Sequence, residues 1–302
     1  MYDLIIVGSG PAGLSAAVYG MRAGLHVLVM EERPMSGGQV LNTYEVDNYL
    51  GMPGMSGFDM GMRFREHANT MGAEFRTAKV TSLTDNGQVK KVVTADGTAY
   101  EARAVLLAAG AEHAVLGVTG EEQYRGKGVS YCATCDGAFF KGRNVAVVGG
   151  GDVAVEDAVY LARLCSKVYL IHRRDSLRAA KSLQKKLMSC DNVEILWDTT
   201  VEEIEGSDLV ESVKLRHVKE GKEQTLSVDG LFIAVGMRPN TEAFKDVVAC
   251  DERGYVIAGE DCITKTAGIY AAGDIRTKQV RQIITAVADG ACAIASIERF
   301  LL

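Results

Sequence analysis

The sequence has few of the features that mark disordered, secreted or membrane-spanning chains. Only 4 of its 302 residues are proline, and 47% are hydrophobic against 24% charged, which argues against disorder and collagen-like structure. No apolar run reaches the roughly 18–20 residues that cross a bilayer, and residues 1–13 lack the basic start of a signal peptide. With a net charge of −6 there is no basic excess. We expect a cytoplasmic protein that binds neither nucleic acid nor a membrane.

The cysteines are too few and too scattered for a disulfide framework. There are 7, and the five apart from residues 132 and 135 stand singly: Cys165, Cys190, Cys250, Cys262 and Cys292. A zinc site needs four ligands, and neither a second CxxC nor paired histidines occur in the sequence. The sequence therefore predicts no metal. Its length predicts two domains of moderate size.

A glycine-rich turn stands near the start, in "DLIIVGSGPAGLSAAVYGMRAGLHVLVMEER" (3–33), between an apolar strand and a segment with helical spacing. Gly8 permits a tight turn, Gly10 lets the backbone approach a pyrophosphate, and Gly13 lets the helix pack closely on the strand. The helix N-terminus adds amide donors for phosphates. A second strand, 27–30, ends at Glu31, whose carboxylate can accept hydrogen bonds from ribose hydroxyls. This order predicts a dinucleotide site.

A second copy of the pattern occupies residues 144–181, with small residues at Gly149, Gly151 and Ala154. Where the first copy has Glu31, the second has His172, followed by a cluster of arginines at positions 173, 174 and 178. Cations at that point suit a 2′-phosphate, so we expect NADPH rather than NADH. An ordinary solvated loop is the alternative. Short strand signals fill 79–111 and 201–240, which predicts a β-meander in each unit. The predicted fold is α/β, with two Rossmann-like dinucleotide-binding domains, each a parallel sheet with an inserted β-meander.

The segment "SYCATCDGAFF" (130–140) places two thiols three positions apart beside a carboxylate. A redox dithiol explains Cys132 and Cys135 better than a zinc site or a structural disulfide does in a reducing compartment. One thiolate attacks a partner disulfide and the other resolves the mixed disulfide. Asp136 is suited to protonating a leaving thiolate, although a turn residue before Gly137 is the simpler alternative.

At this point the chain resembles the low-molecular-weight thioredoxin reductases over nearly its whole length. The resemblance rests on "GSGPAG" (8–13), "SGGQV" (36–40), "VDNYLGMPG" (46–54), "GKGVSYCATCDG" (126–137), "GGGDVAVE" with "HRRDSLR", "GMRPNT" (236–241) and residues 268–290. It implies that Cys132 is the attacking thiol, Cys135 the thiol nearer the flavin, and Asp136 the proton donor and acceptor. It further implies that Asp274 contacts the ribityl chain of FAD and that Arg281 and Gln282 lie near the flavin ring.

By the glycine patterns and this resemblance, we expect two sets of cofactor-binding residues. For FAD they are Gly8, Ser9, Gly10, Pro11, Ala12, Gly13, Glu31, Glu32, Gly37, Gly38, Gln39, Val40, Asn48, Gly110, Gly273, Asp274, Arg281, Gln282 and Ile283. For NADPH they are Gly149, Gly151, Asp152, Val153, Ala154, His172, Arg173, Arg174, Arg178 and Gly236.

The order of the motifs implies that residues 114–242, with the NADPH site and the CxxC, are inserted into an FAD-binding domain made of 1–113 and 243–302. One flavin must then meet NADPH and the dithiol in turn, so we expect the inserted domain to rotate about hinges near 112–117 and 236–241. The expected activity passes a hydride from NADPH to FAD, then electrons to the Cys132–Cys135 disulfide and to thioredoxin, in a homodimer. Three alternatives stay open: a reductase of another disulfide partner, a ferredoxin-dependent relative, and a non-catalytic redox sensor.

Overall fold

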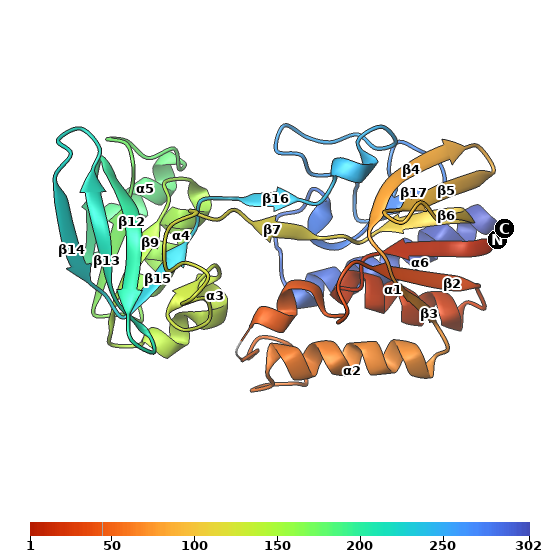
Figure 1. Cartoon of the computed structure of the whole chain (residues 1–302), viewed down its shortest axis with the longest axis horizontal. Helices are drawn as coiled ribbons and strands as arrows, with labels where there is room; N and C mark the ends of the chain where they lie inside the picture. The colour runs from red at the N-terminus through yellow and green to blue at the C-terminus, as the bar shows by residue number, and fades with distance from the viewer. Residues whose placement is uncertain (44) are drawn as a thin grey trace. The chain divides into compact units, whose positions relative to one another are not determined.

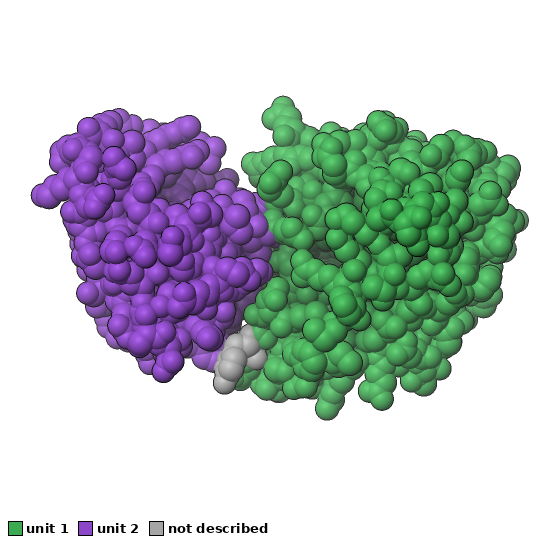
Figure 2. Space-filling view, viewed as in Figure 1, with its two compact units in different colours: residues 1–112, 238–302 green, residues 113–237 purple. Residues whose placement is uncertain are grey.

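The computed structural model of the chain describes residues 1–43 and 45–302 and divides them into two compact units. Unit 1 comprises residues 1–112 and 238–302, and unit 2 comprises residues 113–237 (Figure 2). Among the described residues, no helix is both long and apolar enough to cross a membrane.

Unit 1 is built on a seven-stranded sheet with the order β3-β2-β1-β6-β5-β4 (Figure 1). The seventh strand, β17, pairs with the last residues of β6, 105–107, whereas β5 pairs with its residues 99–102. The central pairs are parallel, whereas β4, β5 and β6 form an antiparallel meander that returns to β1. The strands are β1 (Tyr2–Val7), β2 (Val27–Glu31), β3 (Glu74–Thr77), β4 (Val80–Asn86), β5 (Val89–Thr94), β6 (Ala99–Leu107) and β17 (Ile269–Ala271). The helices are α1 (Pro11–Arg22), η1 (Gly38–Asn42), α2 (Gly57–Thr70), η3 (Glu242–Phe244), η4 (Gly273–Ile275) and α6 (Ile283–Leu301).

The strands of this sheet are apolar without interruption because both of its faces are covered. Leu4 and Ile6 pack with α1 and α6 on one face, while Ile5 and Val7 pack on the other face with the segment after η3. All four side chains are buried. Alternate side chains of a strand point to opposite faces, so this continuous apolar run gives each face its own core.

Unit 2 repeats the plan with a five-stranded parallel sheet, order β11-β10-β9-β15-β8, and a separate antiparallel sheet, β12-β13-β14. The strands are β8 (Val129–Ser130), β9 (Asn144–Val148), β10 (Lys167–Ile171), β11 (Val193–Leu196), β12 (Thr199–Gly206), β13 (Val210–His217), β14 (Glu223–Ser227) and β15 (Gly230–Ile233). The helices are α3 (Ala133–Asp136), η2 (Gly137–Phe140), α4 (Asp152–Ala162) and α5 (Lys181–Met188). The predicted α/β class, with two parallel sheets and a meander in each unit, is confirmed.

Two short strands join the units, β7 (Ala111–His113) and β16 (Met237–Pro239), and they pair with each other. The division falls after Glu112 and after Met237, so the second boundary precedes the expected residue 242. The reason lies in Asn240, whose backbone amide donates to Gly110 O (3.0 Å) and whose side-chain amide donates to Ala109 O (2.9 Å). These bonds attach residue 240 to the first unit.

Candidate active site

The first glycine turn lies between β1 and α1, where backbone is packed against backbone. A Cβ on Gly8, whose φ is +104°, would lie 2.4 Å from Ala108 O, and a Cβ on Gly13 would lie 1.9 Å from Gly8 O. Gly10, the residue before α1, differs: a Cβ there would have no described neighbour closer than 4.0 Å. Two of these glycines are therefore required by the fold, while the third faces open space.

Glu31 ends β2 directly beside this turn. Its Oε2 accepts hydrogen bonds from the backbone amide (2.8 Å) and the hydroxyl (2.7 Å) of Ser9, and its Oε1 accepts one from the amide of Arg33 (3.0 Å). The carboxylate thus helps to hold the turn in place. Glu32, also expected at this site, forms an exposed ion pair with Lys79 (2.7 Å).

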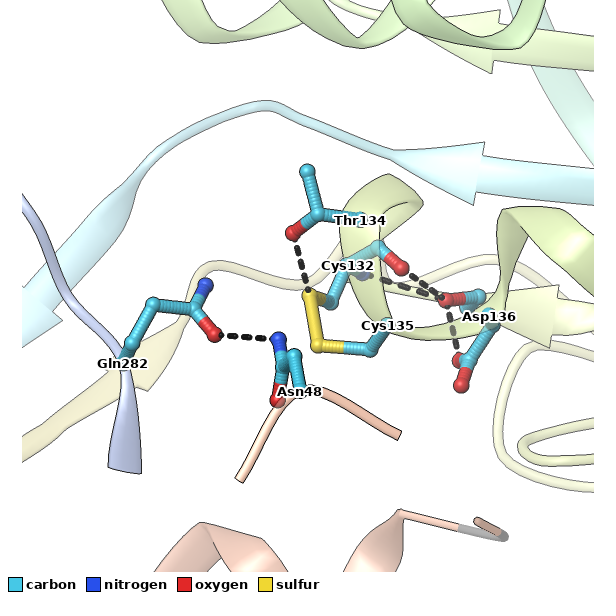
Figure 3. The surroundings of a disulfide bond; sticks show 7 residues. Asn48, Cys132, Thr134, Cys135, Asp136 and Gln282 are labelled. Carbon is cyan, nitrogen blue, oxygen red and sulfur yellow. Dashed lines mark hydrogen bonds between the residues drawn. A yellow bond between two sulfur atoms is a disulfide. The ribbon is translucent and has the colours of Figure 1, made fainter. Parts of the chain in front are cut away.

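Gly37 and Gly38, also expected to bind FAD, lie against the same turn. The amide of Gly37 donates to Ser9 O (2.8 Å), and a Cβ on Gly38 would lie 3.3 Å from the Cα of Gly10. Val40 in η1 and Ile283 at the start of α6 belong to one apolar cluster. The Asn48 side-chain amide donates to Gln282 Oε1 (3.0 Å), and Gln282 caps α6 (Figure 3). Pro11 and Ala12 open α1, Gln39 lies in η1, and Gly110 directly precedes β7.

The closing segment, 268–290, contains two polar side chains, each with a buried atom that has no hydrogen-bond partner among the described residues. In η4, Asp274 Oδ1 is buried and has no hydrogen-bond partner among residues 1–43 and 45–302, and burial raises the pKa of its carboxyl. Arg281 lies over the ring of Tyr255, 4.1 Å from its centroid, and its buried Nε also lacks a partner in the described part of the chain. Both groups have the capacity to bind a polar ligand.

The second glycine turn, between β9 and α4, has a different point of closest packing. A Cβ on Gly150 would lie 2.2 Å from His172 Cε1, whereas a Cβ on Gly151 or Gly236 would meet no described atom within 4 Å. At the start of α4, Ala154 is fully buried and Val153 is mostly exposed. Asp152 Oδ1 accepts from the amide of Ala180 (2.8 Å). In the same turn, Gly149 would place a Cβ 2.5 Å from the Ala154 Cβ.

His172 and the three arginines occupy different environments. The His172 ring is buried under the turn, with Nε2 3.1 Å from Ser176 O, and burial lowers its pKa. Arg173, Arg174 and Arg178 are exposed, and no ion pair within the described ranges holds any of them. The turn is joined to this loop because the Arg178 amide donates to Gly150 O (2.7 Å). His172 therefore supports the turn, and the arginines are free to meet an anion.

Cys132 and Cys135 form a disulfide at the short helix α3 (Figure 3). The carbonyl of Cys132 accepts from the amides of Cys135 (3.3 Å) and Asp136 (3.1 Å). Thr134 is exposed, with its hydroxyl 3.5 Å from Cys132 Sγ. The turn packs closely on α4, because a Cβ on Gly137 would lie 3.0 Å from Tyr160 and Leu161 atoms.

Asp136 is held by a serine that the sequence analysis did not single out. The Ser130 hydroxyl donates to Asp136 Oδ2 (2.6 Å) and accepts from the Cys132 amide (3.1 Å). Asp136 Oδ1 is buried and has no partner in the described residues. Burial raises the pKa of this carboxyl, and the Ser130 hydrogen bond opposes that rise only in part. The side chain can therefore hold a proton at a higher pH than an exposed aspartate.

The buried Glu121 connects the segment that follows β7 with the turn that carries the disulfide. Glu121 accepts hydrogen bonds from the amides of Leu116 (3.1 Å) and Gly117 (2.7 Å) and from the hydroxyl of Tyr131 (2.7 Å). The Tyr131 ring lies 5.1 Å from the ring of His113, between centroids. Residues 116 and 117, which we expected to be part of a hinge, are thus hydrogen-bonded within unit 2.

The other five cysteines carry no sign of redox pairing. All are free, and Cys165 and Cys262 are buried within apolar clusters. Burial raises the pKa of Cys165 to about 11 and that of Cys262 to about 12, which suppresses their thiolates. In the described part of the chain, no group of three or more His, Cys, Asp and Glu side chains is arranged to hold a metal ion.

Comparison with known proteins decides the family. A family model described as pyridine nucleotide-disulphide oxidoreductase matches residues 2–290. The chain belongs to that family. Within it, a thioredoxin reductase of Listeria innocua is 46% identical over 302 residues, which are 100% of this chain and 94% of that protein. Two solved relatives also align over 100% of this chain. The Streptococcus pyogenes thioredoxin reductase has 44% identity and a TM-score of 0.94 (98% of that chain). The Lactococcus lactis thioredoxin reductase in the FR conformation has 40% and 0.70 (99% of that chain).

These matches confirm the predicted resemblance to thioredoxin reductases. They also confirm that the chain is an NADPH-dependent flavoprotein oxidoreductase and that its cofactors are FAD and NADPH. The geometry fits both cofactors on independent grounds. Gly10 and Gly151 each lie at the start of a helix. The space beside each Cα is open because glycine has no Cβ, and a dinucleotide phosphate needs such a space. Asp274 Oδ1 and Arg281 Nε offer unpaired polar atoms in the unit expected to bind FAD.

Sequence reasoning missed two polar side chains at the disulfide turn, Ser130 and Glu121. It also missed a set of buried ion pairs in the closing segment, formed by Arg276, Lys278 and Asp289. One of them left a signal: Asp289 is an acidic residue within the apolar run of α6, "IITAVADGACAIASI" (283–297). A charge at such a position requires buried partners.

Proposed function

We propose that this flavoprotein reduces thioredoxin, with Cys132 as the attacking thiol, Cys135 as the resolving thiol and Asp136 as the acid and base. When bound, FAD accepts a hydride from NADPH and supplies the electron pair that reduces the disulfide. The observation that carries the proposal is the disulfide itself, because it lies in one turn with a carboxyl whose buried Oδ1 has no hydrogen-bond partner among the described residues.

The thiols and the carboxyl have separable tasks. Reduction of the disulfide takes two electrons and two protons and leaves two thiols. The Cys132 thiol gives its proton to Asp136, and the resulting thiolate attacks one sulfur of the thioredoxin disulfide. The other thioredoxin sulfur leaves as a thiolate, which gains a proton. Cys135 attacks Cys132 in the mixed disulfide, which releases the second thioredoxin thiolate and restores the starting disulfide. Asp136 Oδ1 is suited to deliver and regain these protons, since Ser130 occupies only Oδ2.

The partner and the cofactor residues are parts of this proposal. Thioredoxin is supported by the curated relatives named thioredoxin reductase at 42–46% identity. For NADPH, the support is the arginine group at 173, 174 and 178 beside the Gly151 turn. For FAD, it is the Gly10 turn, against which Gly38 and Gly273 lie, and the adjacent Asp274, whose buried Oδ1 has no partner in the described residues. We include a homodimer, a cytoplasmic location and rotation of unit 2 between half-reactions. An engineered cross-link between the units should abolish turnover, and an unchanged rate would refute the rotation.

An anaerobic titration with NADPH tests the order of the acceptors. The purified flavoprotein should take up two electron pairs per chain, one for FAD and one for the disulfide, before NADPH accumulates. Cys135→Ser should take up one pair. Cys190→Ser is the matched control, because that thiol is outside the disulfide and donates to Lys186 O (3.4 Å), and this variant should still take up two pairs.

Steady-state turnover then tests the partner. With NADPH in excess, the protein should reduce a bacterial thioredoxin disulfide catalytically, and Cys132→Ser should not. If the protein takes up two electron pairs but does not reduce thioredoxin, its partner is another disulfide protein. If it takes up electrons but reduces no disulfide protein catalytically, a redox sensor is indicated. If NADPH fails to bleach the flavin, the donor assignment is wrong. Light scattering on a size-exclusion column measures the molar mass in solution and so tests whether the protein is a homodimer.

A further inference from the structure

A buried ionic network underlies the loop that carries Asp274. From α6, Asp289 extends both carboxylate oxygens to segment 273–278. Its Oδ2 accepts from the amide of Gly273 (2.8 Å), from Arg276 Nε (2.8 Å) and from Lys278 Nζ (2.9 Å), and its Oδ1 accepts from Arg276 Nη2 (2.6 Å). One carboxylate therefore fixes the residues on both sides of Asp274.

The network is deeply buried and highly directional. The side chains of Arg276, Lys278 and Asp289 are each less than 10% exposed. Burial by itself would raise the pKa of Asp289, but hydrogen bonds from Arg276 and Lys278 outweigh it and hold that pKa below its ordinary value. Arg276 also donates through Nη1 to Thr277 O (2.9 Å). Because burying charges is costly, a network of this kind contributes geometry more than stability.

The network lies where α6 meets the first dinucleotide turn. α1 and α6 lie side by side in unit 1 (Figure 1), and a Cβ on Gly290, the residue after Asp289, would lie 2.3 Å from Ala12 O. A Cβ on Gly273 would lie 2.9 Å from Ala12 Cβ. The loop, α6 and the start of α1 are thus closely packed against one another. In the same loop, Asp274 Oδ1 has no hydrogen-bond partner in the part of the chain that the structure describes.

We infer that Asp289 is a positioning residue for the FAD site, which holds segment 273–278 so that Asp274 Oδ1 is presented to the bound cofactor. This role rests on the proposed binding of FAD beside Asp274, and it is separate from the thiol chemistry and from the thioredoxin partner. It explains why the apolar stripe of α6 contains a buried carboxylate.

The dissociation constant of FAD for the apoprotein measures this role directly. Asp289→Asn keeps the shape of the side chain but removes the carboxylate charge that Arg276 and Lys278 contact. We expect the constant, measured by flavin fluorescence with the full chain, to rise at least about tenfold, which corresponds to 1.4 kcal/mol. Glu298→Gln, an exposed change on the same helix, is the matched control and should leave the constant unchanged.

A double-mutant cycle with Asp274→Asn separates positioning from general weakening. If Asp289 acts through Asp274, then Asp289→Asn should raise the constant much less when Asp274→Asn is already present. An equal factor in both backgrounds, or no change in the single variant, overturns the inference. If Asp289→Asn does not fold, Lys278→Met replaces it in the cycle, because that change leaves the Arg276–Asp289 pair intact. A smaller rise is expected there, with the same dependence on Asp274.

Discussion

Two adjacent glycines of the second dinucleotide turn should respond oppositely to the same substitution. Gly150→Ala places a Cβ 2.2, 2.3 and 2.7 Å from three atoms of the His172 ring, where ordinary contacts begin at 3.4 Å. The ring cannot simply turn away, because it is buried and its Nε2 is hydrogen-bonded to Ser176 O. Either the ring or the turn must move by about 1 Å. Overpacking of this kind costs about 1–3 kcal/mol.

Gly151→Ala is the matched control, because its Cβ meets no described atom within 4 Å and its φ of −93° suits alanine. The fold should accept it. The added methyl instead occupies the space we assign to the NADPH pyrophosphate at the start of α4. We expect the KM for NADPH to rise about tenfold or more, a loss of 1.4 kcal/mol or more in binding.

The assay compares thermal unfolding with NADPH kinetics for both variants. Gly150→Ala should lower Tm by on the order of 5 °C and also raise KM, since Gly150 O holds the Arg178 amide. Gly151→Ala should raise KM at an unchanged Tm. A fall in Tm for Gly151→Ala as large as for Gly150→Ala would refute the packing argument, and an unchanged KM would refute the cofactor assignment.

Three further predictions concern the FAD turn and the redox turn. Gly10→Ala should give a folded apoprotein with weakened FAD affinity, measured by fluorescence titration. Gly13→Ala should prevent folding, measured by circular dichroism, because its Cβ would lie 1.9 Å from the carbonyl oxygen of Gly8. Asp136→Asn should slow thioredoxin reduction yet raise stability in urea at pH 8. Since burial raises this pKa, the folded state loses stability as pH rises from the unfolded pKa to the folded one, and the gain should shrink towards pH 4. Ser130→Ala removes the hydrogen bond that lowers this pKa, so the alkaline limb of the pH–rate profile should move to higher pH; a limb that stays in place would argue against Asp136 as the acid.

The local patterns were sufficient for the architecture and for the chemical groups. Each glycine turn lies between a buried strand and a helix because the apolar runs, the small residues and the helical spacing all agree along one short stretch. The pairing of Cys132 with Cys135 needed only their spacing. The order of motifs implied an inserted unit, because the two halves of the FAD pattern flank the other motifs in the sequence.

Tertiary structure decided which groups are engaged and which remain free, since that depends on residues distant in the chain. The Glu31 carboxylate accepts hydrogen bonds from Ser9, and the His172 ring supports the Gly150 turn; neither contact could be read from sequence position. Asp289 reaches segment 273–278 because α6 packs against the loop that precedes it. Periodicity shows which face of a helix is buried, but the partner of a buried charge is fixed only when the elements pack.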